Sequence, residues 1–87
     1  MIVLSRITFK KLQKKFEAAQ KAEPPKKMNI LFNYQVGGIG KQKEGWIIAL
    51  SNDHITNTNT ICFEFTDNSQ VSFSHSKCTS IILLNSD

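Results

Sequence analysis

The feature that most constrains this chain is a helical pattern over residues 4–23, which two prolines bring to an end. Four apolar residues recur at spacings of three and four and share one helix face: Phe9, Leu12, Phe16 and Ala19. Ser5 is a suitable N-cap, and Pro24 and Pro25 each disfavour helical geometry in the residue before them. The pattern predicts an amphipathic helix whose narrow apolar stripe must pack on another element.

The chain after the helix reads as short strands joined by turns. Alternating or continuous apolar residues predict strands at 28–36, 46–50, 61–66, 71–75 and 79–84. Glycines and polar residues predict a flexible hairpin loop with a basic tip at 37–45, and turns at 51–60 and 67–69. Because each connection is too short for a parallel crossover, we expect antiparallel pairing.

These elements predict an α+β fold, in which an N-terminal amphipathic helix packs on a small five-stranded antiparallel sheet or partly closed β-barrel. The 87 residues suit a single domain over 1–87, with a Pro/Lys connector at 24–27, strands within 28–84 and a frayed end at 85–87. The order of one helix and five strands resembles several small barrels, including the Sm-like ring proteins. That resemblance is architectural only, because these strands lack the expected glycine and asparagine signatures.

Charge is distributed unevenly along the chain. Residues 1–43 hold ten basic residues against Glu17 and Glu23, a formal charge of +8, whereas residues 44–87 carry −4. Such asymmetry suggests an anionic partner for the first half, although a solvated lysine-rich helix that keeps the protein soluble would show the same pattern.

The candidate anion-binding residues are therefore the basic residues of the first half. They are Arg6, Lys10, Lys11, Lys14, Lys15, Lys21, Lys26, Lys27, Lys41 and Lys43. We expect them to line one side of the protein if the loop at 37–45 lies near the helix. Tyr34 and Trp46 flank that loop and are candidates for stacking on bases, with a purely structural role as the alternative.

Metal and catalytic chemistry are not expected. Cys62, His75 and Cys78, with His54 as a conceivable fourth ligand, include one pair at close spacing, whereas a structural zinc site usually shows paired ligands. We therefore predict no metal or cofactor, and two free thiols rather than a disulfide. The glycines at 37–40 are not followed by the lysine and helix of a phosphate loop, and no nucleophile, base and orienting group share a recognisable spacing, so the chain is not expected to be an enzyme.

Two functions from different classes remain open. The first is a non-enzymatic binding protein whose basic helix and loop dock, without sequence preference, on nucleic acid or a nucleoprotein. The second is a small inhibitor or adaptor, of the kind that phages and mobile elements encode, which blocks a host enzyme by steric docking. An exposed strand edge would also allow a homodimer. No apolar run approaches the ~20 residues of a membrane span, so a cytoplasmic protein without a membrane partner is expected.

Overall fold

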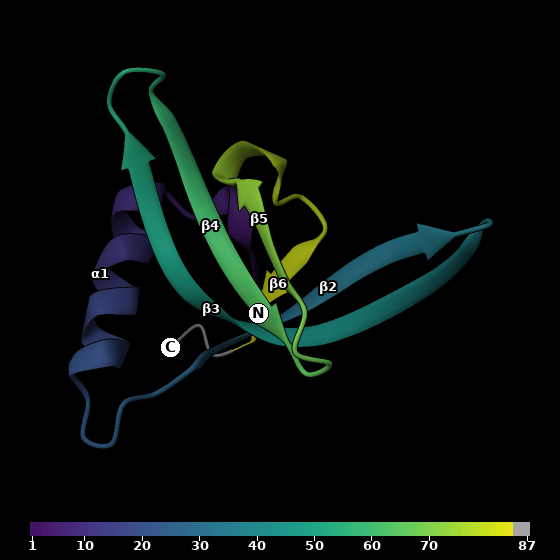
Figure 1. Cartoon of the computed structure of the whole chain (residues 1–87), viewed down its shortest axis with the longest axis horizontal. Coiled ribbons are helices and arrows are strands. Elements are labelled where there is room, and N and C mark those ends of the chain that lie inside the picture. The colour runs from purple at the N-terminus through teal and green to yellow at the C-terminus, as the bar shows by residue number, and fades with distance from the viewer. Residues whose placement is uncertain (85–87) are drawn as a thin grey trace.

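The computed structural model describes residues 1–84 and shows one α-helix beside a six-stranded antiparallel sheet (Figure 1). In chain order the elements are β1 (Ile2–Val3), η1 (Leu4–Arg6), α1 (Phe9–Lys21), β2 (Met28–Val36), β3 (Ile39–Asp53), β4 (Thr58–Phe65), β5 (Gln70–Ser74), η2 (His75–Lys77) and β6 (Ile81–Leu83), where η marks a 3₁₀ turn. The strand order in the sheet is β1-β6-β2-β3-β4-β5. The frayed end predicted at 85–87 lies outside the described residues.

The predicted α+β class is confirmed, but the described chain has six strands rather than five. The additional strand is β1, which pairs Ile2 with Leu83 and Val3 with Ile82. Two residues are too few to show a periodic pattern, so this strand has no local signature. The sheet of residues 1–84 remains open, with β1 and β5 as its edges, and does not close into a barrel.

The helix is shorter than the predicted span of 4–23. Thr8 is its N-cap, and the Thr8 side chain accepts a hydrogen bond from the Lys11 backbone N–H at 3.2 Å. Ser5, the predicted cap, lies instead in the 3₁₀ turn η1. Beyond the helix, the Lys26 N–H donates to the Ala19 carbonyl at 2.9 Å, so the connector turns back along the last turn of α1.

The core lies between α1 and one face of the sheet. Ile7, which falls within the predicted helix of 4–23, precedes the observed helix in extended backbone and is buried. Phe16 is only partly buried against the core. The buried residues that form the core are Leu4, Ile7, Phe9, Leu12, Met28, Ile30, Ile47, Ile61, Phe63, Phe65, Cys78, Ile81 and Leu83.

The prediction of a flexible loop at 37–45 is wrong. The turn consists of Gly37 and Gly38 alone, at φ +58° and +81°, a left-handed conformation that glycine adopts without steric cost. Residues 39–45 belong to β3, which pairs with β2 along its first half and with β4 along its second. Gly45 lies in the short stretch of β3 that pairs with both neighbours.

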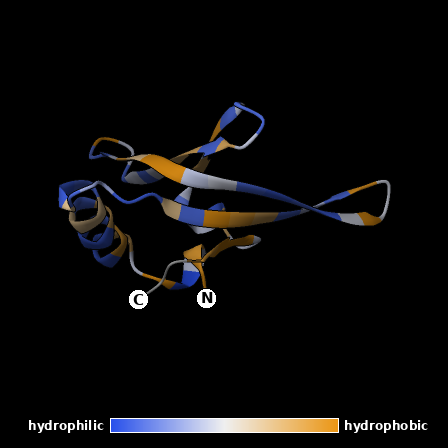
Figure 2. Ribbon diagram, turned by 90° about the horizontal axis from the view of Figure 1, so that it is seen from below, coloured by the Kyte–Doolittle hydropathy of each residue, from blue (hydrophilic) through white to orange (hydrophobic). Residues whose placement is uncertain are grey.

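The outer part of the β2–β3 hairpin projects from the body as a two-stranded arm, which we define as residues 33–42. β6 begins opposite Phe32, and β4 ends opposite Gly45, so neither strand reaches the arm. Both views show the arm and α1 at opposite ends of the molecule (Figures 1 and 2). The second hairpin is also longer than predicted, because β3 continues to Asp53 and β4 resumes at Thr58.

His75, which follows β5, forms hydrogen bonds to the segment that precedes α1. The His75 Nε2 lies 2.9 Å from the Leu4 carbonyl oxygen and 2.8 Å from that of Ile7. Because both partners can only accept, Nε2 carries the proton and donates to both. The ring also meets Phe9 edge-on, with the two centroids 5.8 Å apart. His75 therefore holds the segment between β1 and α1 in place.

Candidate anion-binding surface

The most basic feature of the described residues is a groove between α1 and the start of β2, which we call the helix groove. It is lined by Lys15, Ala18, Ala19, Ala22, Lys26, Lys27, Met28 and Leu84, and it encloses about 610 Å³. Among the residues that the structure describes, no carboxylate lines it. The volume falls within the range of small-molecule sites. The groove is therefore lined by alanines and by three lysines from two separate segments.

The local geometry of the connector explains why these lysines converge. Lys15 lies on the flank of α1 that faces the connector, and the hydrogen bond from Lys26 to Ala19 folds the connector against the same flank. That bond also satisfies one of the carbonyls that the end of a helix leaves without a partner. The partial negative charge at the helix end, which would repel an anion, is reduced accordingly.

Lys27 is positioned by an aromatic ring. Its Nζ lies 3.8 Å from the centroid of the Trp46 ring, a cation–π contact. This contact places the Lys27 ammonium over the half-buried indole and occupies one face of its ring. Trp46 therefore has a structural role, and a base could stack only on its other face.

The remaining helix lysines lie outside the groove. Lys10, Lys14 and Lys21 are exposed on the other flank of α1, together with Glu17, the one carboxylate within the helix. Lys11 is also exposed and lies one helical turn before Lys15, on the same flank as the groove. Arg6 is exposed in η1. These side chains are exposed to solvent, and the two flanks differ in that, among the residues of α1, Glu17 lies beside Lys10, Lys14 and Lys21 whereas no carboxylate accompanies Lys11 and Lys15.

Two of the predicted basic residues lie away from the helix. Lys41 is exposed on the arm, and Lys43 follows it toward the body, so the expectation that the hairpin adds to the basic face of the helix is wrong. The reason is that the segment at 37–45 belongs to the β2–β3 hairpin, which projects from the body at the end opposite α1.

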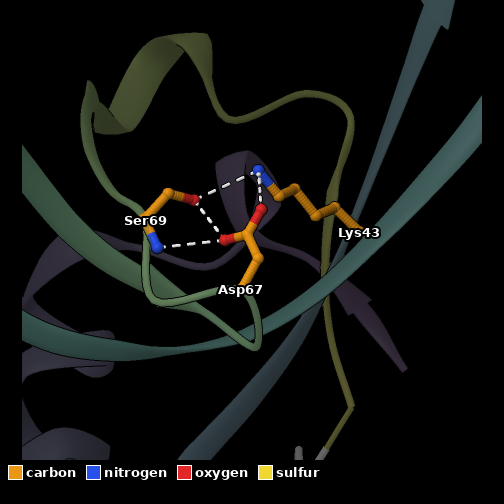
Figure 3. A network of polar contacts seen from close by, with 3 residues as sticks. All are labelled: Lys43, Asp67 and Ser69. Carbon is orange, nitrogen blue, oxygen red and sulfur yellow. Dashed lines mark hydrogen bonds and ion pairs between the residues drawn. The ribbon is translucent and has the colours of Figure 1, made fainter.

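Lys43 is also engaged in a polar network with the β4–β5 turn (Figure 3). Its Nζ lies 2.8 Å from the Asp67 Oδ2 and 3.1 Å from the Ser69 Oγ, and 4.7 Å from the centroid of Phe65. Ser69 donates to the Asp67 Oδ1 through its backbone N–H at 3.0 Å and its hydroxyl at 2.5 Å. Hydrogen bonds from Lys43 and Ser69 hold the pKa of the Asp67 carboxyl well below its usual range. This charge pair fixes the base of the arm, so we remove Lys43 from the anion-binding surface.

Tyr34 and Trp46 do not form a common stacking platform. The register pairs Tyr34 with Lys41 and Trp46 with Asn29, which places the two aromatic residues on opposite faces of the sheet. Tyr34 is half-buried and packs against Phe32, with ring centroids 5.4 Å apart. It extends the aromatic part of the core onto the arm.

The cysteine and histidine residues do not assemble a metal site. No group of three or more His, Cys, Asp or Glu side chains in residues 1–84 lies close enough to hold an ion. Both cysteines are free thiols, with Cys78 buried and the Cys62 Sγ at 3.1 Å from the Ser72 Oγ. Burial raises the pKa of Cys78 to about 11.

Comparisons with known proteins give no further assignment. No protein-family model, curated protein or solved structure matches this chain. Within the described residues, no helix is long and apolar enough to cross a membrane.

Proposed function

We propose that this protein is a non-enzymatic nucleic-acid-binding protein whose contact surface is the helix groove and the adjoining basic flank of α1. The observation that supports it most is the convergence of Lys15, Lys26 and Lys27 on a groove without a described carboxylate. Phosphates carry the charge that such a set attracts, and the alanines that line the groove let a backbone approach closely.

The residue types argue for contacts to phosphates rather than to base edges. An ammonium group is a compact charge without directional preference, whereas bidentate reading of guanine favours arginine, of which the chain has one, Arg6. The proposed binding is therefore tolerant of sequence and strongly dependent on salt.

Fluorescence anisotropy of labelled single-stranded and duplex oligonucleotides tests the proposal. Each phosphate contact contributes about 0.9 to the slope of log K against log salt on duplex and about 0.7 on single strands. With the three groove lysines engaged, we expect a slope of about −2 to −3. Absence of binding at low salt would contradict the proposal and leave the lysines with a role in solubility.

A matched pair of double variants locates the surface. Lys15→Gln with Lys26→Gln removes two charges from the groove, and Lys10→Gln with Lys14→Gln removes two from the other helix flank, so both proteins have the same net charge. Loss of two contacts should reduce the slope by about 2 and weaken duplex binding up to about 60-fold at about 0.1 M salt. We expect this loss for the groove pair and a smaller one for the flank pair. Equal losses would mean that only net charge matters.

A protein partner is the second candidate, and one feature of the sheet favours it. Val3, Ile82 and Leu31 are register neighbours across β1, β6 and β2 on the face away from the core, and none of them is fully buried. An inhibitor or adaptor that blocks a host enzyme could dock through this apolar row. Such docking would respond weakly to salt and would be lost in Leu31→Lys but not in the groove variants.

A further inference from the structure

The arm has two backbone edges without a strand partner in the described chain. In a two-residue hairpin closed by Val36 and Ile39, the backbone groups of alternate residues point outward from the ribbon. The last bond from β2 to its outer neighbour runs from the Asn33 N–H to the Ser80 carbonyl at 2.9 Å. Beyond it, the N–H and C=O of Gln35 face outward with no strand of residues 1–84 beside them.

The arm is also poorly supported as a folded element. A two-stranded hairpin is marginally stable in water unless another strand or a core supports it. Here the pair that closes the turn is apolar and exposed, with Val36 at 52% and Ile39 at 67% of full exposure. Figure 2 shows hydrophobic residues near the tip of an arm that is otherwise largely hydrophilic. Both observations indicate a partner for the arm.

The two edges of the arm differ in charge. The β3 edge carries Lys41, and charged side chains, lysine above all, discourage the addition of another strand. The β2 edge consists of Asn33, Tyr34, Gln35 and Val36, which include no charge and no proline. The β2 edge is therefore the one open to pairing.

We propose that two copies of this chain form a dimer by antiparallel pairing of their β2 edges over residues 34–36, which makes a four-stranded ribbon from two arms. A two-fold axis at Gln35 places the outward N–H and C=O of Gln35 opposite the same groups of the second copy. The paired segments are uncharged, so no like charges face each other across the contact. The same axis also joins the exposed Val36 and Ile39 pairs into one apolar face. Because α1 lies at the end of the molecule opposite the arm, the two basic helices stay far apart.

The pairing is limited to a short segment, because β6 occupies the same edge of β2 from Asn33 inward. We therefore expect a weak dimer that depends on protein concentration. Sedimentation velocity or light scattering from about 5 to about 500 µM, a range suited to micromolar affinity, should show a mass that rises from 9.9 kDa toward twice that value. A constant mass of 9.9 kDa over this range would overturn the proposal.

Matched substitutions on the two edges of the arm distinguish this contact from nonspecific association. Gln35→Pro removes an outward N–H from the β2 edge without touching a bond between β2 and β3, and Gln42→Pro makes the same change on the β3 edge. We expect Gln35→Pro to remain monomeric over the range and Gln42→Pro to associate like the wild type. Gln35→Lys and Gln42→Lys repeat the comparison without proline, with thermal unfolding as the control for folding.

Three outcomes oppose the proposal. Dimerisation that persists in Gln35→Pro and Gln35→Lys, or that is lost equally in the Gln42 variants, would exclude the β2 edge as the contact. Loss of association in Ile55→Lys, which changes the apolar residue that is 96% exposed at the β3–β4 turn, would assign the contact to that turn instead. None of these results depends on whether the protein binds nucleic acid.

Discussion

Replacement of Gly45 by alanine should destabilise this protein severely, although glycine is usually the weaker residue within a strand. At Gly45, β4 passes unusually close to β3. A methyl group there would lie 2.3 Å from the Glu64 carbonyl oxygen, 2.8 Å from the Phe65 Cδ1 and 3.1 Å from the Phe65 Cα. Two of these atoms belong to the backbone of the neighbouring strand, so rotation of a side chain cannot relieve the contact.

The size of the effect follows from what must move. The distance of 2.8 Å to the Phe65 Cδ1 is about 1 Å shorter than the 3.5–4.0 Å at which carbon atoms attract, so β3 and β4 must separate at this point. Such overpacking costs roughly 1–3 kcal/mol, and strain on the adjacent bond from the Thr66 N–H to the Glu44 carbonyl (3.1 Å) adds about 1 kcal/mol. Alanine loses less conformational entropy on folding than glycine does, and this difference offsets about 0.5–1 kcal/mol of the destabilisation. We expect a net loss of about 1–3.5 kcal/mol, a large fraction of the stability of a small domain.

Urea unfolding monitored by circular dichroism measures this loss, and Gly40→Ala is the control. A methyl group at Gly40, in the same strand, would meet no atom within 4 Å. Gly40→Ala should therefore be neutral or slightly stabilising. With a denaturant slope of about 1 kcal/mol per M, Gly45→Ala should unfold at a urea concentration about 1–3.5 M lower than the control. Equal midpoints for the two variants would refute the argument from close approach.

Three further predictions concern single side chains. His75→Ala should lower the free energy of unfolding by roughly 1–3 kcal/mol, because the carbonyls of Leu4 and Ile7 lose their shared donor, as thermal unfolding would show. Because the pKa of Asp67 is lowered in the fold, its ionised form stabilises the protein at pH values above the ordinary pKa of 3.8, and this contribution is lost as the pH falls below 3.8. The difference in melting temperature between wild type and Asp67→Asn should therefore shrink as the pH is lowered below 3.8. Cys78, buried and with its pKa raised to about 11, should be alkylated at neutral pH only when the protein unfolds, which mass spectrometry with and without urea would detect.

The sequence predicted those parts of the fold in which local pattern and burial agree. Phe9 and Leu12 face the core as the helical period requires, and Pro24 and Pro25 follow closely after the helix end. The start of the helix was placed too early, because both Ser5 and Thr8 can act as caps and only the packing of Ile7 decides between them. A cap motif alone does not contain that tertiary information.

The arm and the edge strand escaped prediction for physical reasons. Residues 39–44 form a strand that has no core beneath it, so their side chains show no apolar alternation, and the glycines around them suggested a loop instead. For the binding surface, the lysines were evident in the sequence, but their division between the helix groove and the arm was not. That division depends on the direction in which the β2–β3 hairpin leaves the body, which composition does not encode.

The placement of β6 also determines when this sheet can be completed. β6 lies between β1 and β2 in the sheet, yet it follows all the other described strands in the chain. The hairpins β2–β3 and β4–β5 can form from neighbouring segments while the chain is still emerging from the ribosome, whereas β1 has no place to bind until Ile81–Leu83 arrive. Closing so long a loop carries an entropic cost that is recovered only once β6 has been made. Until then the nascent chain exposes an unpaired edge of β2, and a chaperone that protects this edge would have most effect there.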